Sequence, residues 1–221
     1  NPAPFRPPML SHALEKGDFD TLDPDDFAAE WKWDGIRVQA VAGTDEDRRQ
    51  TRRLYSRTGD DISAAFPDLV EALDFDAAID GELLIVRKGR VQSFNTLQQR
   101  LNRKTVTAKM LAEYPAHLIA YDLLVEGGED LREASFEARR LRLETLVASL
   151  DTDRITLSPL VEFSTGDERT AARAAPASNG AGSDAEAVEG VMIKRLESPY
   201  LAGRPKGHWW KWKRDPFNVD A

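Results

Sequence analysis

An alternating apolar pattern runs from Glu30 to Ala42 and contains the stretch Lys32-Trp33-Asp34-Gly35-Ile36-Arg37. The alternation predicts a strand that is interrupted at Asp34-Gly35, a pair typical of tight turns. Lys32, Asp34 and Arg37 would then lie close together around one turn. A desolvated amine near other cations loses its proton more readily and becomes a nucleophile, and a guanidinium forks two hydrogen bonds to a phosphate or a ribose. These six residues fit either a site for phosphate chemistry or a charged surface hairpin.

Further strands and helices follow along the chain. Apolar alternation or short apolar runs predict strands at residues 54–57, 77–86, 117–125, 187–195 and 209–214. Helical spacing predicts helices at residues 67–73, 94–101, 106–114 and 167–175. Ser135 is a good N-cap for the clearest helix, which continues with Phe136, Ala138, Leu141, Leu143, Leu146 and Val147. Residues 176–187, rich in Ala, Ser, Gly and Asn, predict a mobile loop or connector. The mixture indicates an α+β domain built on largely antiparallel sheets.

Charge is distributed unevenly along the 221 residues, whose net charge is −8. Residues 83–112 carry seven cations and no acid, and residues 194–214 carry seven cations and one acid. The acidic total argues against a nucleic-acid partner, whereas the two basic stretches fit either phosphate contacts or solvated basic faces. There is no cysteine, and the three histidines form no metal-spaced pair, so a metal is expected to bind through carboxylates and phosphates. With no bilayer-length apolar run and no signal-peptide pattern, the chain is expected to be intracellular and to contact no membrane.

Six segments, in order, resemble the motifs of the covalent nucleotidyltransferase superfamily, which comprises polynucleotide ligases and messenger-RNA capping enzymes. The resemblance spans nearly the whole chain. The segments are Lys32 to Arg37, Ser56-Arg57-Thr58-Gly59, Asp80-Gly81-Glu82, Tyr121-Asp122, Glu189-Gly190-Val191-Met192-Ile193-Lys194 and Lys211-Trp212-Lys213. The resemblance implies an ATP-grasp-like fold, in which two mainly antiparallel β-sheets are flanked by helices and the nucleotide pocket lies between the sheets.

The resemblance also implies roles for individual residues. Lys32 is the expected nucleophile toward the α-phosphorus of the nucleotide, and the expected catalytic residues are Lys32, Asp34, Arg37, Lys211 and Lys213. Asp34 would orient the lysine or hold metal-bound water. Glu82 would accept hydrogen bonds from the ribose, Tyr121 would stack on the base, and the lysines would flank the phosphates. The expected nucleotide-binding residues are Glu30, Trp31, Lys32, Arg37, Arg57, Glu82, Tyr121, Met192, Lys194, Lys211 and Lys213. Glu189 and Glu82 are the expected ligands of Mg²⁺, with Mn²⁺ as an alternative.

Two features favour ATP-dependent DNA ligases within this superfamily. Glu30 lies two residues before Lys32, where the glutamate of these ligases accepts a hydrogen bond from the adenine amino group. Residues 93–100 and the segment Ser198-Pro199-Tyr200 with Gly203-Arg204 resemble stretches of bacterial and archaeal-type enzymes. The resemblance implies nicked double-stranded DNA as the partner, contacted by Arg100, Arg103 and Lys104 without base readout. An RNA ligase or a GTP-using capping enzyme is the alternative.

The implied reaction has three steps. Lys32 displaces pyrophosphate from ATP, AMP passes to the 5′-phosphate of a nick, and the 3′-hydroxyl expels AMP; such activity serves DNA repair, replication and recombination. The family's oligonucleotide-binding barrel would follow residue 213, which leaves no room for it before Ala221. The chain is therefore expected to bind ATP and to adenylate Lys32 weakly, but to seal nicks poorly or not at all. It is also expected to be a monomer. Because Asn1 is no natural initiator, residues are also expected upstream.

Overall fold

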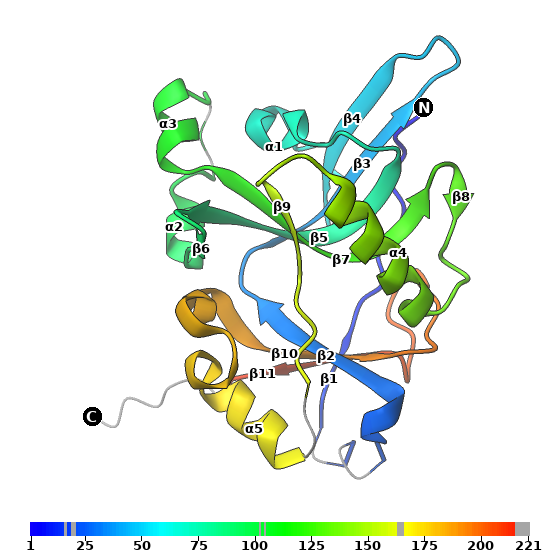
Figure 1. Cartoon of the computed structure of the whole chain (residues 1–221), viewed down its shortest axis with the longest axis vertical. Helices are drawn as coiled ribbons and strands as arrows, with labels where there is room; N and C mark the ends of the chain where they lie inside the picture. Colours follow the sequence, from blue (N-terminus) through cyan, green and yellow to red (C-terminus); the bar gives the residue numbers. More distant parts are fainter. Residues whose placement is uncertain (16, 19–20, 102, 104, 163–165, 215–221) are drawn as a thin grey trace.

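Two β-sheets lie one above the other, with helices around the larger sheet (Figure 1). This is seen in a computed structural model that describes residues 1–15, 17–18, 21–101, 103, 105–162 and 166–214. The larger sheet has the strand order β4-β3-β5-β7-β8, with β6 beside β5 and β9 beside β7; the smaller has the order β1-β11-β10-β2. The expected α+β class with mainly antiparallel sheets is confirmed, because only the β1–β11 and β7–β9 pairs are parallel among the named strands of the described residues.

The larger sheet contains the main hydrophobic core. Its strands are β3 (Ile36–Thr44), β4 (Gln50–Ser56), β5 (Ala77–Arg87), β6 (Arg90–Val91), β7 (Ala116–Glu126), β8 (Glu129–Asp130) and β9 (Ile155–Leu157). Nine consecutive residues of β5 are buried, which fits a central strand covered on both faces. One face packs on Leu69 and Leu73 near α1 (Pro67–Glu71), on α2 (Phe94–Gln98) and on α4 (Phe136–Ser149).

The smaller sheet is formed by segments far apart in the sequence. It contains β1 (His12–Ala13), β2 (Phe27–Trp33), β10 (Val188–Arg195) and β11 (Trp209–Lys213). On one face, Trp31, Val191 and Ile193 pack with Trp210 and Ala172 of α5 (Gly166–Ala174). The other face, which turns toward the larger sheet, carries more polar residues and forms one wall of a pocket.

The clearest predicted helix is confirmed as α4, whose Ser135 hydroxyl accepts the hydrogen bond of the Ala138 N–H at 3.1 Å. Its buried face differs from the expected one. Phe136, Arg139, Arg140 and Leu143 are buried, whereas Leu141 is 60% exposed. Two arginines therefore face the protein interior, a placement that apolar spacing did not predict.

The remaining short elements connect the sheets. They are η1 (Pro24–Asp26), η2 (Ser63–Ala65), α3 (Ala108–Glu113), η3 (Pro176–Asn179) and η4 (Gly182–Ala187). Residues 176–187, predicted to be a mobile loop or connector, connect α5 to β10 and contain the short 3-10 helices η3 and η4. Among the described residues, every helix is too short or too polar to cross a membrane.

Asp34-Gly35 separates two strands, as predicted, but these strands do not form a hairpin. β2 pairs with β10 in the smaller sheet, and β3 pairs with β4 and β5 in the larger one. A Cβ atom on Gly35 would lie 2.4 Å from the Leu83 carbonyl oxygen, so the chain passes between the sheets at a point where only glycine fits. The surface-hairpin interpretation is therefore excluded, and Lys32 lies at the junction of the two sheets.

Candidate active site

A pocket of about 460 Å³ lies between the two sheets. Both sheets and the segment after β4 contribute to its walls. Its lining consists of Leu10, Ser11, Glu30, Trp31, Lys32, Trp33, Gly35, Ile36, Arg37, Ser56, Arg57, Thr58, Glu82, Tyr121, Glu189, Met192, Lys194, Arg204, Trp209 and Lys211. Residues from all six motif segments therefore contribute to one cavity.

Strand register explains the wall formed by the smaller sheet. Residues paired across antiparallel strands share a face. Glu30 pairs with Met192, which pairs with Lys211, and Lys32 pairs with Gly190, which pairs with Lys213. These two rows lie side by side on the face turned toward the pocket.

Two irregularities in the strands contribute further side chains to the pocket. The β10–β2 register shifts between Val188 and Gly190, which leaves Glu189 unpaired. The β5–β7 register shifts between Asp80 and Gly81, which leaves Tyr121 unpaired. β-Bulges redirect side chains and are common beside active sites. Here each shift adds a pocket-lining residue, Glu189 from one sheet and Tyr121 from the other.

Lys32 forms an ion pair with Glu189 through Nζ and Oε1. Both side chains are partly buried, with exposed fractions of 20% and 29%. The pKa of Asp34 is raised by burial and by the neighbouring Glu189 carboxylate. The pKa of Lys211 is lowered by burial and by nearby cations, first Lys213 and then Arg204 and Lys32. A group of cations whose charges repel one another suits an anionic ligand of high charge.

The wall formed by the larger sheet centres on Arg37. Its guanidinium donates two hydrogen bonds to Asp80, at 3.1 and 2.7 Å, and a third to the Tyr200 hydroxyl at 3.3 Å. The Tyr200 hydroxyl in turn donates to Asp80 Oδ2 at 2.6 Å. Since Asp80 is 2% exposed, these partners offset the cost of burying its charge. Asp80 and Tyr200, which do not line the pocket, thus hold the guanidinium of Arg37, which does.

Glu82 pairs with Arg37 across β5 and β3. Burial raises the pKa of Glu82 to about 8, although Lys32 and Arg37 act in the opposite direction. Burial thus favours the protonated form of this carboxyl group. A protonated carboxyl group both donates and accepts hydrogen bonds, which suits contact with a ribose hydroxyl better than contact with a metal ion.

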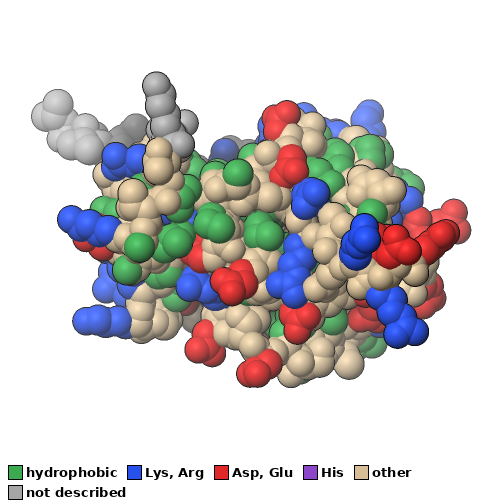
Figure 2. Space-filling view, turned by 90° about the horizontal axis from the view of Figure 1, so that it is seen from above, with side chains coloured by type: hydrophobic (Ala, Val, Ile, Leu, Met, Phe, Trp, Pro, Cys, Tyr) green, Lys and Arg blue, Asp and Glu red, His purple; other side chains and the backbone are tan. Residues whose placement is uncertain are grey.

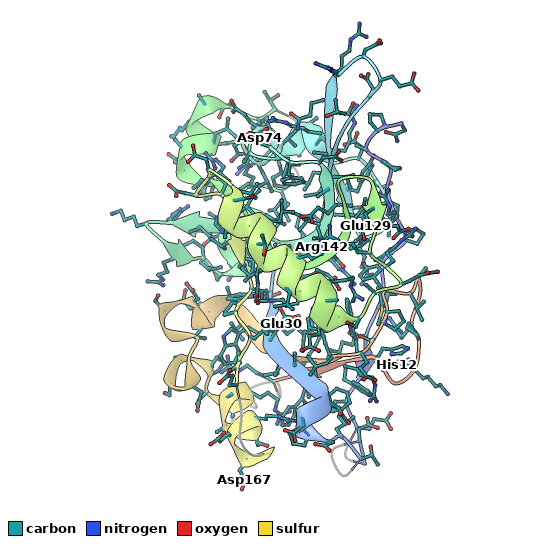
Figure 3. The ribbon with its side chains drawn as sticks, turned by 45° about the vertical axis from the view of Figure 1, so that its right-hand side comes forward. His12, Glu30, Asp74, Glu129, Arg142 and Asp167 are labelled. Atoms are coloured by element: carbon teal, nitrogen blue, oxygen red, sulfur yellow. The ribbon has the colours of Figure 1, made fainter. Side chains whose placement is uncertain are left out.

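One end of the pocket contains the buried Glu30, which Figure 3 shows where β2 approaches α4. Lys194 Nζ lies 2.6 Å from Glu30 Oε2. The same ammonium group lies 4.6 Å from the ring centroids of both Tyr121 and Trp209. This end offers one carboxylate acceptor beside two aromatic rings.

The profile described as "ATP dependent DNA ligase domain" matches residues 8–213. The chain belongs to this family.

Relatives and solved structures agree with this membership. A "Probable DNA ligase" from Koribacter versatilis is 32% identical over 230 residues, which cover 96% of this chain and 39% of the relative. The ligase domain of LigD from M. tuberculosis has a TM-score of 0.68 and 27% identity, over 94% of this chain and 59% of that one. A mycobacterial DNA ligase D complexed with ATP and MES has a TM-score of 0.63 and 29% identity, over 94% and 60% of the two chains. This ligase domain thus spans 39% of the length of the curated relative.

Most of the predicted site residues meet in the pocket of this ligase domain. Glu30, Trp31, Lys32, Arg37, Arg57, Glu82, Tyr121, Met192, Lys194, Lys211 and Glu189 line it. Asp34 and Lys213 lie outside the lining, but Lys213 is close enough to influence the pKa values of both Asp34 and Lys211. The carboxylates fit a metal ion only in part, because no group of three or more His, Cys, Asp or Glu side chains among the described residues forms a ligand cluster. Glu189 remains a suitable ligand for an ion that also takes phosphate oxygens and water.

The expected DNA-contacting residues need a correction. Arg100 is 3% exposed, and its guanidinium donates to both oxygens of Asp68, at 2.8 and 2.5 Å, so it stabilises the core and is not available to a phosphate on the surface. Its helical spacing from the buried Leu97 is a signal of this placement. Arg103 is exposed, and its contact with DNA stays a prediction. Lys104 lies outside the described residues.

Several pocket residues were missed by sequence reasoning. Arg204, Trp209, Ser11 and Thr58 line the pocket, and Asp80 and Tyr200 orient Arg37 from behind it. Asp80 lies within the motif Asp80-Gly81-Glu82, and Trp209 lies two residues before the motif Lys211-Trp212-Lys213. Their positions in the sequence could therefore have indicated that they belong to the site. Nothing in the local sequence indicated that the Tyr200 hydroxyl would reach β5.

Proposed function

We propose that this chain is the adenylation domain of an ATP-dependent DNA ligase, in which Lys32 accepts AMP and the AMP then passes to the 5′-phosphate of a DNA nick. The observation that carries the proposal is the position of the Lys32 amine, which is paired with Glu189 in a pocket that also contains Arg37 and Lys211. Membership of the ATP-dependent DNA ligase domain family supports it, as does the likeness to a ligase solved in complex with ATP.

The first step forms a bond between Lys32 Nζ and the α-phosphorus. The bond from that phosphorus to the bridging oxygen breaks, and pyrophosphate leaves with the bonding electrons. Lys32 must first lose a proton, and Glu189 is the carboxylate in contact with its Nζ. Lys211 and Arg37 offset the negative charge that develops on the phosphate oxygens, while Glu82 and Tyr121 contact the ribose and the base.

Mg²⁺, with Mn²⁺ as the alternative, would be held by Glu189 and phosphate oxygens and would neutralise phosphate charge. In the later steps a 5′-phosphate oxygen displaces Lys32 from AMP, and the 3′-hydroxyl then attacks that phosphate and releases AMP. Such a domain acts inside the cell on nicked double-stranded DNA, as a monomer. Arg103 is the described cation expected to face the DNA backbone.

A pulse–chase experiment tests this proposal. The protein is incubated with ATP labelled at the α-phosphate and, separately, at the γ-phosphate, and is then denatured. We expect label to stay on the protein only from the α-phosphate, and a chase with nicked DNA to move it to the DNA 5′ end. Nicked RNA and labelled GTP serve as the competing substrates. A denaturation-resistant label from GTP with none from ATP, or transfer to RNA alone, would refute the proposal.

A further inference from the structure

Arg140 of α4 lies behind Glu30, outside the pocket lining, and contacts its carboxylate. Its Nη1 donates to Glu30 Oε1 at 3.2 Å. The two side chains are 5% and 2% exposed. Lys194 occupies the other oxygen of the same carboxylate at 2.6 Å. The Glu30 carboxylate is thus held from two sides by cations on different elements, one on α4 and one on β10.

The Arg140 guanidinium is itself fixed by two further contacts. Its Nη2 donates to the Ser158 carbonyl oxygen at 2.6 Å, and its Nε donates to Glu144 at 3.0 Å. The Ser158 hydroxyl accepts a hydrogen bond from the Trp33 indole at 3.1 Å. A planar guanidinium with three occupied donors has little freedom to turn, so its contact with Glu30 has a defined direction.

Glu30 lines the pocket, whereas Arg140 does not. Arg140 therefore contacts the pocket lining directly through its hydrogen bond to Glu30. Each carboxylate oxygen has two lone pairs, so the two cations leave acceptor capacity free on Glu30. The Lys194 ammonium group lies over the rings of Tyr121 and Trp209, and these rings line the pocket together with Glu30. A purine that enters this end of the pocket meets an acceptor held in one orientation.

We infer that Arg140 is a positioning residue for base selection, because it holds Glu30 so that the pocket accepts a purine with an exocyclic amino group and rejects one with a carbonyl oxygen at the same position. This inference rests on the proposed function, since it concerns the base of the same nucleotide.

The physical reason is the mismatch that an immobile acceptor creates. An amino group donates to the carboxylate, while a carbonyl oxygen brings a second acceptor against it and leaves both groups unsatisfied in a buried place. A carboxylate that is free to rotate would turn away from the carbonyl and lose this discrimination. Arg140 removes that freedom, so its loss is expected to lower selectivity more than it lowers the chemical rate.

The experiment compares covalent nucleotide transfer from ATP and from inosine triphosphate, whose base carries a carbonyl in place of the amino group. It measures kcat and KM for the unaltered protein and for Arg140→Gln and Arg140→Lys. We expect Arg140→Gln to raise KM for ATP and to reduce the preference for ATP by about 10- to 100-fold, with kcat nearly unchanged. Arg140→Lys keeps the charge without the fork and is expected to give an intermediate preference.

The control comes from the same helix. Arg142→Gln removes a surface pair with Glu129 (Figure 3) and leaves the contacts of Arg140 in place. It is expected to keep the preference of the unaltered protein. An unchanged preference in the folded Arg140 variants would overturn the inference, as would equal use of the two nucleotides by the unaltered protein, a result that needs no variant. Absence of any protein-bound nucleotide would instead refute the proposed function.

Discussion

At the residue scale, the arrangement around Lys32 depends on partners from distant parts of the chain. Glu189 contacts its amine, and Arg37 lies in the same pocket, held by Asp80 and Tyr200. Arg37 can present its guanidinium to a phosphate in only one direction, because Asp80 occupies two of its donors. The chemistry proposed for Lys32 therefore depends on residues that do not contact the nucleotide themselves.

Tyr200→Phe tests this dependence. The change removes the hydroxyl that donates to Asp80 and accepts from Arg37, so we expect transfer of AMP to Lys32 to slow by about five- to tenfold, equivalent to roughly 1–1.5 kcal/mol. Stopped-flow or quenched-flow kinetics of the single turnover measure it. Tyr114→Phe is the matched control, because the Tyr114 ring lies under Arg87, away from the pocket. Equal rates in the two variants would contradict the assigned contact.

The carboxyl group of Glu82 predicts a pH dependence of stability. Its pKa rises from the ordinary 4.5 to about 8 because it is buried. Between these values the folded protein holds the proton that the unfolded chain releases, so this group makes stability fall as pH rises through the window. We expect Glu82→Gln to remove this contribution. The melting temperature of the variant minus that of the unaltered protein should therefore increase from pH 5 to pH 8. The exposed Glu46→Gln is the control, and a difference that stays constant over this range would count against the raised pKa.

At the element scale, the pocket depends on irregular points in regular strands. The shift at Glu189 is followed by Gly190, where a Cβ atom would lie 2.2 Å from the Trp212 carbonyl oxygen. The close approach of β10 and β11 at this point keeps Lys211 and Lys213 in register with Met192 and Gly190. Glycine is required here by the neighbouring backbone, which cannot move without disturbing the row of lysines.

Gly190→Ala should therefore be destabilising. We expect the free energy of unfolding to fall by about 1–3 kcal/mol, the usual cost of overpacking, and adenylation to slow because β11 is displaced. Chemical denaturation and the AMP-transfer rate measure the two effects. Gly17→Ala is the control, since a Cβ atom there meets no atom within 4 Å. If Gly190→Ala matched Gly17→Ala in both measurements, the close approach of the strands would not exist in solution.

The sequence predicted the positions of the strands better than it predicted which strands pair and which side chains contact one another. Alternation or short apolar runs located β2, β5, β7 and β10, because both patterns report how the side chains of a strand are buried. They did not show that β2 and β3 belong to different sheets, since pairing is decided by contacts that are distant in the sequence. Sequence reasoning also misjudged Arg100, because the burial of this charged side chain depends on Asp68, a partner 32 residues away in the sequence; the spacing from Leu97 was the one local signal that was used too little. The motif residues were found because each motif is local.

At the scale of the whole molecule, α4 links the two sheets. Arg139 pairs with Asp122 of the larger sheet and donates to the Ser198 carbonyl oxygen beyond β10, while Arg140 reaches Glu30 of the smaller sheet. These contacts join the two sheets at the Glu30 side of the pocket. On the molecule's surface, acidic and basic side chains lie close together on the face shown in Figure 2. Contact with DNA is expected to depend on local basic groups, because the total charge of −8 is unfavourable.

Arg103→Gln tests that expectation. If the exposed Arg103 contacts one backbone phosphate, we expect weaker binding to nicked DNA and a salt dependence that is shallower by about one unit of slope, with transfer of AMP to Lys32 unchanged. Fluorescence anisotropy over a range of salt concentrations measures it. Arg132→Gln, which removes a surface pair with Asp130, is the control. An unaltered slope would remove Arg103 from the proposed DNA surface.

Peptide mapping by mass spectrometry after incubation with ATP tests the central claim most directly, because it identifies the residue that carries AMP. The structure places two lysines with different surroundings in one pocket, Lys32 beside Glu189 and Lys211 among other cations. We expect AMP on Lys32, and no adduct on the intact Lys32→Ala protein. AMP on Lys211 or another lysine, or an adduct that persists in Lys32→Ala, would contradict the account.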